Sequence, residues 1–141
     1  MTIVWQKNYN VNVLEIDEQY LRLVDSFNQL VRLVKRGVDL TEISILVELV
    51  QEQSQICFNS ETVYFSKLGF SDFDAYRQGH SSCLIQLSHF KKNYDQQQPL
   101  INLAHVEGIA RALLGHVATS HSAFNDFMKK NRISSFIRAH A

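Results

Sequence analysis

Apolar residues recur at spacings of three and four along most of the chain, and the positions between them are mainly polar. This is the periodicity of α-helices that bury one face, and it occurs in four successive stretches. Alternation with a period of two, which would indicate strands, is nearly absent. The four predicted helices cover Asp17–Arg36, Asp39–Leu68, Ser71–Tyr94 and Pro99–Phe124, and the last can continue or restart through Met128.

Residues that start or stop helices separate the four stretches. Gly37 suits a left-handed cap after the first helix, and Gly69 stops the second. Asp39 and Ser71 can each cap the following helix, with an acidic residue three positions later. Pro99 fits the first turn of the fourth helix. Because short loops join antiparallel neighbours, the sequence predicts an all-α, up-and-down four-helix bundle.

The composition indicates a single domain over residues 1–141, with an N-terminal arm and a short C-terminal tail, because 45% of the residues are hydrophobic. The 14 Lys and Arg residues balance the 14 Asp and Glu residues, so no surface for nucleic acid or anionic lipid is indicated. No apolar run approaches the roughly 20 residues of a membrane span, and no secretory pattern is present. Two cysteines on different predicted helices fit a reducing compartment, and we expect a soluble, cytoplasmic protein.

Seven polar or ionisable residues interrupt the inward faces of the predicted helices. An unpaired buried carboxylate or imidazole costs several kcal/mol, so a set contributed by every helix indicates a shared binding site. Two pairs are four residues apart, which is how helical bundles present ligands to a metal. The candidate ligands are Tyr20, Cys57, Glu61, Tyr76, His80, His116 and His121.

Each candidate also has a purely structural interpretation. The two tyrosines can be core aromatic residues with hydrogen-bonded hydroxyls, and Cys57 can be a small buried apolar residue. Glu61 needs a cation, which a charged histidine can supply in place of a metal. Since His116 and His121 are five residues apart, one of them can point partly outward from a regular helix.

Several motifs of the chain carry a resemblance to a known family. A tryptophan in the N-terminal arm precedes an Ile-Asp-Glu-Gln run, and three further helices each present a spaced pair of polar residues. Taken together, these motifs resemble those of the hemerythrin family, above all its bacterial single-domain members, over nearly the whole chain. The matching segments are Trp5, Ile16–Tyr20, Cys57–Glu61, Tyr76–His80, and His116 with His121.

The resemblance implies a hemerythrin-like bundle, a family in which five histidines and two bridging carboxylates hold two irons that bind O2. Three of the seven family ligands are retained, namely Glu61, His80 and His116, and the other four are substituted. His121 stands where the family has a bridging aspartate, and an imidazole ordinarily binds one metal. We therefore expect one metal position, for iron or for zinc or another divalent ion, and a di-iron centre with reversible oxygen carriage is disfavoured.

The favoured function is a non-enzymatic protein for metal binding or for oxygen or redox sensing, with O2 or another small gas as a further partner. One alternative is a metal-free interaction or signalling bundle with a degenerate polar site. Another is a haem or redox protein in which imidazoles and Cys57 bind a different cofactor. No nucleophile and base arrangement, phosphate loop or nucleotide motif supports a hydrolase or kinase.

Overall fold

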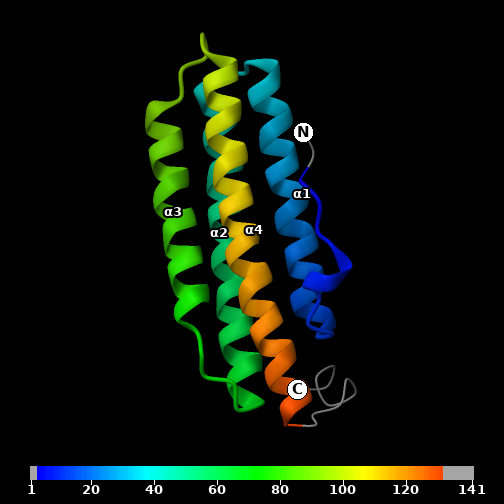
Figure 1. Ribbon diagram of the computed structural model, residues 1–141. Helices are drawn as coiled ribbons and strands as arrows, with labels where there is room; N and C mark the ends of the chain where they lie inside the picture. Colours follow the sequence, from blue (N-terminus) through cyan, green and yellow to red (C-terminus); the bar gives the residue numbers. More distant parts are fainter. Residues whose placement is uncertain (1–2, 132–141) are drawn as a thin grey trace.

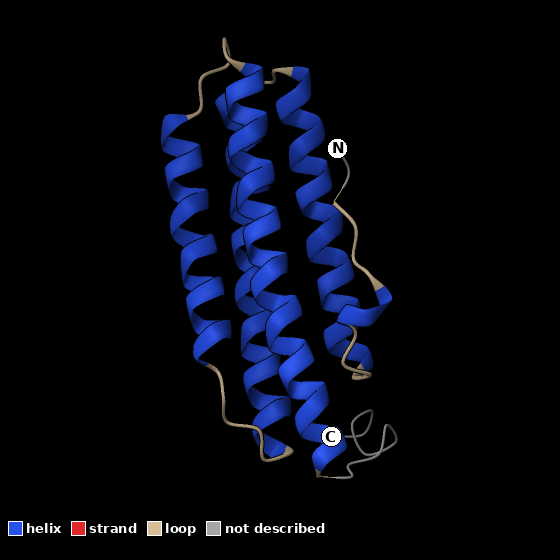
Figure 2. Cartoon of the chain, in the orientation of Figure 1, coloured by secondary structure: helices blue, strands red, loops and turns tan. Residues whose placement is uncertain are grey.

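The computed structural model describes residues 3–131, apart from the side chain of Ala75, and the predicted C-terminal tail lies outside this range. The described residues form four long helices and a short 3-10 helix, without strands (Figure 2). These elements are η1 (Lys7–Tyr9), α1 (Leu14–Arg36), α2 (Leu40–Lys67), α3 (Asp74–Asn93) and α4 (Pro99–Lys130). Each helix packs on its neighbours in the chain, and α1 packs on α4 to close the bundle (Figure 1). The predicted all-α, up-and-down four-helix bundle is confirmed.

Three helix ends follow the local chemistry that the sequence indicates. Gly37 ends α1 in the left-handed region with φ of +68°. The Asp39 side chain caps α2 by accepting a hydrogen bond from the Glu42 amide at 3.1 Å. Pro99 occupies the first turn of α4, which continues without a break to Lys130.

Two other helix starts differ from the prediction. The first helix begins at Leu14, ahead of Asp17, because the Asp17 carboxylate lies inside the first turn and accepts hydrogen bonds from two amides of the N-terminal arm. The predicted cap by Ser71 is wrong. The third helix begins at Asp74, and its N-cap residue, Phe73, makes no side-chain cap bond. Ser71 therefore lies before the helix, where its carbonyl accepts a hydrogen bond from the Phe73 amide.

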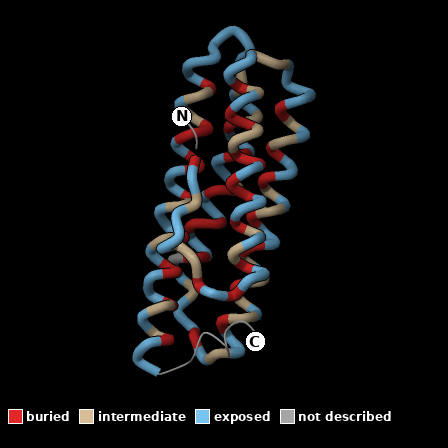
Figure 3. The backbone as a smooth tube through the Cα atoms, turned by 90° about the vertical axis from the view of Figure 1, so that its right-hand side faces the viewer, coloured by how far each residue is buried: buried red, intermediate tan, exposed pale blue. Residues whose placement is uncertain are grey.

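The inward faces of the four helices meet along the bundle axis, where the buried positions gather (Figure 3). Nearly all residues of the predicted apolar stripes are buried or half-buried there. Among the described helices, none combines enough length with enough apolarity to cross a membrane. The core is therefore the interior that the periodicity predicts, and its polar members can be located within it.

Candidate metal centre

Six of the seven candidate ligands lie in the bundle core, and each of them is at most 3% exposed. All four helices contribute: α1 provides one, α2 and α3 provide two each, and α4 provides one. The buried candidates are Tyr20, Cys57, Glu61, Tyr76, His80 and His121. The expectation that polar groups from every helix share one interior is met by these six residues.

His116 is the seventh candidate, and the expectation that it is buried is wrong because its side chain is exposed. At about 100° per residue, His116 lies about 80° from the middle of the α4 inner face, where Phe124 points inward. His116 instead lies against α3, since a Cβ on Gly79 would be only 2.6 Å from the His116 Cβ. The spacing of five residues lets His121 face the core and turns His116 to the edge.

His121 and Glu61 form a fully buried pair. Nε2 of His121 lies 2.5 Å from Oε1 of Glu61, and Nδ1 lies 2.6 Å from the carbonyl oxygen of Tyr9. A carbonyl can only accept, so Nδ1 carries a hydrogen and donates it to Tyr9. Nε2 and Oε1 then share one proton, whichever atom holds it. Without a metal the pair is electrically neutral, which suits a site away from water.

His80 has its two ring nitrogens engaged by neutral hydroxyl groups. Nδ1 lies 2.8 Å from Oγ of Ser54, and Nε2 lies 3.1 Å from the Tyr20 hydroxyl. Burial lowers the pKa of His80 to about 4, and the nearby histidine charges act in the same direction. His80 is therefore a neutral imidazole at neutral pH, as a metal ligand must be.

Both histidines turn Nε2 toward the same carboxylate. Oε2 of Glu61 lies 3.8 Å from Nε2 of His80, and it is a buried oxygen with no hydrogen-bond partner. The Tyr76 hydroxyl is a second buried oxygen without a partner. Such orphaned polar atoms in a dry core are costly, and they indicate a site that a further group can complete.

The electrostatics of the core favour neutral side chains in the absence of an ion. Burial raises the pKa of Glu61, and the charge of His121 opposes that rise. Burial also raises the pKa of Tyr20, Cys57 and Tyr76, and the charge of Glu61 raises each of them further. A bound cation would reverse this balance, because it stabilises carboxylate, phenolate and thiolate forms.

The N-terminal arm covers one side of this cluster and lies beside α1 in Figure 1. The Trp5 ring stacks on Tyr20 with centroids 4.9 Å apart, and it meets the His121 ring edge-on at 5.8 Å. The Tyr9 carbonyl holds the outer nitrogen of His121. Sequence reasoning identified the tryptophan-bearing arm, but it missed the Tyr9 carbonyl, because a backbone oxygen carries no signal in a residue pattern.

Ser54 was also missed, although the sequence contained a signal for it. It lies four residues after Val50 and three before Cys57, on the same inward stripe of α2. Its hydroxyl holds the outer nitrogen of His80. The cluster therefore contains groups that orient both imidazoles as well as the candidate ligands themselves.

The side chains do not converge on one point as they stand. Within residues 3–131, no three His, Cys, Asp or Glu side chains lie close enough together to hold a metal ion. The donor types fit a metal, and Glu61 Oε2 is uncommitted. For Glu61 and both histidines to bind the same ion, the contact between His121 and Glu61 would have to open, and so would the bond between Nε2 of His80 and the Tyr20 hydroxyl.

Comparison with known proteins does not assign the chain to a family. The chain matches no protein-family model, no curated protein and no solved structure. The fold and the core define a class, which is a four-helix bundle with a buried cluster of glutamate, histidine and tyrosine side chains. The resemblance to hemerythrins stays a prediction from the sequence motifs.

Proposed function

We propose that this protein binds a single transition-metal ion in the bundle core through Glu61, His80 and His121. One observation carries the proposal: both imidazoles engage Nδ1 with outer partners and present Nε2 toward a carboxylate whose Oε2 has no hydrogen-bond partner. In metal sites, hydrogen bonds of this kind to the outer nitrogen fix the orientation of ligating histidines. Two imidazoles and one carboxylate suit iron, zinc or copper.

A single ion is favoured over a pair. A second ion would rely on Tyr20 and Cys57 with no imidazole of its own, and because burial raises the pKa of both, it would have to displace two further protons from the core. His121 offers one lone pair at Nε2, since Nδ1 donates to a carbonyl. Bound iron would supply redox chemistry and a binding position for O2 or another small gas, whereas zinc would supply Lewis acidity alone. Oxygen or redox sensing is accordingly the role that we propose for an iron form.

Charge balance assigns a further residue to the ion. Glu61 as a carboxylate compensates one positive charge of a divalent ion in this dry core. Tyr76 is the core tyrosine whose hydroxyl has no hydrogen-bond partner, so it is the available source of a second negative charge. Coordination lowers the pKa of a phenol enough to offset the rise that burial causes.

A second candidate function is a metal-free interaction bundle. It is favoured by the direct bond of 2.5 Å between His121 and Glu61, which neutralises both groups without an ion. In that case the core polar network serves only to specify the packing of the helices. The two candidates differ in what binds at Oε2 of Glu61.

Metal content of the purified protein tests the proposal. We expect about one iron or zinc ion per chain in the wild type, since protein metal sites bind their ion tightly enough to retain it during purification. His121→Ala should lose the metal, and His116→Ala should retain it because the His116 side chain is exposed. An absorption spectrum of the same sample tests the haem alternative.

A wild-type protein without metal, both as purified and after incubation with ferrous iron or zinc, would favour the metal-free bundle. Loss of metal in His116→Ala would instead show that His116 is a ligand, and it would contradict the assignment of Glu61, His80 and His121 alone. His116→Ala keeps the Cβ nearest to Gly79 but removes the ring atoms over it, so circular dichroism has to establish that this control is folded.

A further inference from the structure

The outer face of α2 carries an apolar stripe on the side away from the core. Its positions alternate in steps of four and three residues, which is the spacing of a coiled-coil seam. The four apolar members are between 37% and 61% exposed. The six positions are Ile45, Leu49, Glu52, Ile56, Asn59 and Val63. Exposed apolar side chains that gather on one helix face are a feature of interaction sites in soluble proteins.

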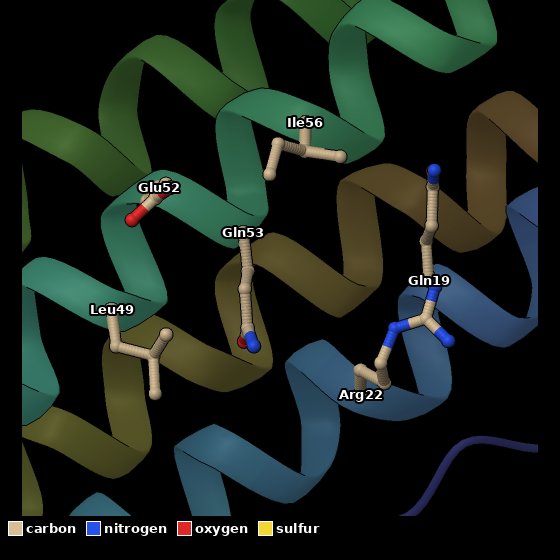
Figure 4. Close-up of a pocket in the computed structure, with 6 residues that line it drawn as sticks. All are labelled: Gln19, Arg22, Leu49, Glu52, Gln53 and Ile56. Atoms are coloured by element: carbon tan, nitrogen blue, oxygen red, sulfur yellow. The ribbon is translucent and has the colours of Figure 1, made fainter.

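A groove between α1 and α2 runs beside this stripe. One pocket of about 290 Å³ contains side chains from both helices, and Figure 4 shows the Gln53 amide reaching toward α1. A neighbouring pocket shares Arg22, Leu49 and Gln53 with it and adds Leu21, which is 52% exposed. The lining of the first pocket is Gln19, Arg22, Leu49, Glu52, Gln53 and Ile56.

The groove has polar groups that the chain itself leaves unsatisfied. Among residues 3–131, neither Arg22 nor Glu52 takes part in an ion pair. The side-chain oxygens of Gln19 and Gln53 are covered and lack hydrogen-bond partners. One free positive charge on α1 thus faces the same pocket as one free negative charge on α2, so the surface is complementary to itself.

We propose that this α1–α2 face binds a second copy of the chain, with the two α2 helices antiparallel across a two-fold axis near residue 54. Arg22 lines the same pocket as Glu52 and Ile56, so all three lie near that axis. The rotation then sets Glu52 of each copy beside Arg22 of the other, and it sets Ile45 against Val63. A two-fold interface uses one patch on both subunits, as this self-complementary patch requires.

The antiparallel direction follows from the same charges. A parallel pair of α2 helices would align each seam residue with its own counterpart. Glu52 would then face Glu52, which is unfavourable at a seam position. The antiparallel arrangement replaces that repulsion with two identical ion pairs between Arg22 and Glu52. The apolar seam and the ion pairs are therefore both satisfied by the antiparallel dimer.

Sedimentation velocity of the full chain tests the proposal. We expect the wild type to dimerise and Ile56→Glu to be monomeric, because the change places a charge in the centre of the seam. Ile85→Glu is the matched control, since Ile85 is 56% exposed and lies on α3, which packs on α2 and α4 and does not line the α1–α2 groove. Circular dichroism of each variant establishes that it is folded.

Charge reversal tests the geometry separately. Arg22→Glu and Glu52→Arg should each weaken the dimer about tenfold, because each disrupts two symmetric ion pairs. The double variant should restore most of the affinity. A wild type that is monomeric up to about 1 mM would overturn the proposal and leave this face to a different protein. A folded Ile56→Glu variant that dimerises like the wild type, or a double variant no tighter than the single ones, would also overturn it.

Discussion

At the centre of the bundle, the two oxygens of Glu61 face two different histidines. Oε1 is 2.5 Å from Nε2 of His121, and Oε2 is 3.8 Å from Nε2 of His80. The same three side chains can therefore hold either a shared proton or a metal ion. The net charge of the core differs between the metal-free and the metal-bound protein. Substitutions of single residues distinguish the metal-free from the metal-bound core, because they show which side chain loses its proton when an ion binds.

The Tyr76 hydroxyl provides one such test. If the protein is loaded with ferric iron, we expect a broad visible charge-transfer band, because Tyr76 is the unpartnered phenol and supplies the phenolate. Tyr76→Phe should remove or shift this band in an absorption spectrum. Tyr94→Phe is the control and should leave it in place, since the Tyr94 hydroxyl donates to the Val38 carbonyl outside the core cluster. A band unchanged in Tyr76→Phe would exclude Tyr76 as a ligand.

His80 makes the metal-free protein sensitive to acid. Its pKa is about 4 in the folded state, below its ordinary value of 6.5, so the unfolded chain binds a proton first as the pH falls. The stability linked to His80 is present above pH 6.5 and is lost as the pH falls toward about 4. We expect a loss on the order of 3 kcal/mol over this window, measured by urea unfolding at each pH.

His80→Gln should flatten this dependence, because glutamine takes up no proton. His89→Gln is the matched control on the same helix, since His89 is exposed, and it should retain the wild-type slope. The comparison concerns the slope of unfolding free energy against pH, which is independent of any general destabilisation. Equal slopes for wild type and His80→Gln would show that His80 is not a buried neutral imidazole.

Residue identity and spacing located most of the core cluster in advance. Glu61, His80 and His121 were predicted because each interrupts an apolar stripe, and a buried charge needs a partner. Their outer partners could not all be found in this way. Ser54 lies on a stripe but looks like an ordinary small residue, and the Tyr9 carbonyl depends on the path of the arm, which no periodicity encodes.

At the scale of the helices, the periodicity predicted all four α-helices and most of their ends, but it did not predict the short 3-10 helix η1. His116 shows where the stripe criterion reaches its limit. A residue three positions after Leu113 can belong to the inner face or to its edge, and the neighbouring helix decides between them. Here Gly79 has no side chain, so α3 and α4 approach closely, and the His116 side chain packs over this glycine at the exposed edge.

The close approach of α3 and α4 makes Gly79 a packing position. Gly79→Ala should destabilise the fold by about 1–3 kcal/mol, because the added Cβ would lie 2.6 Å from the His116 Cβ and the helices must separate. Gly108→Ala is the control: a Cβ there meets nothing within 4 Å, so it should stabilise α4 by about 0.5–1 kcal/mol. Thermal and urea unfolding measure both effects. A neutral Gly79→Ala would mean that the two helices are not in close contact.

At the scale of the whole molecule, the bundle has two distinct polar arrangements. The core cluster lies under the N-terminal arm, with Trp5 stacked on Tyr20, whereas the α1–α2 groove with Arg22 and Glu52 faces outward. The sequence predicted the bundle and the core cluster, since both follow from helical faces. It did not predict the groove, because the outer apolar residues of α2 are recognised only once the inner face is known.

Crystals soaked with zinc test the central claim most directly, through anomalous difference density at the zinc absorption edge. We predict one strong peak in the bundle core, within about 2.2 Å of a Glu61 carboxylate oxygen and of Nε2 of both His80 and His121. The bond between His121 and Glu61 should open in the same crystals. A core without anomalous density, in which His121 stays bonded to Glu61, would contradict the account.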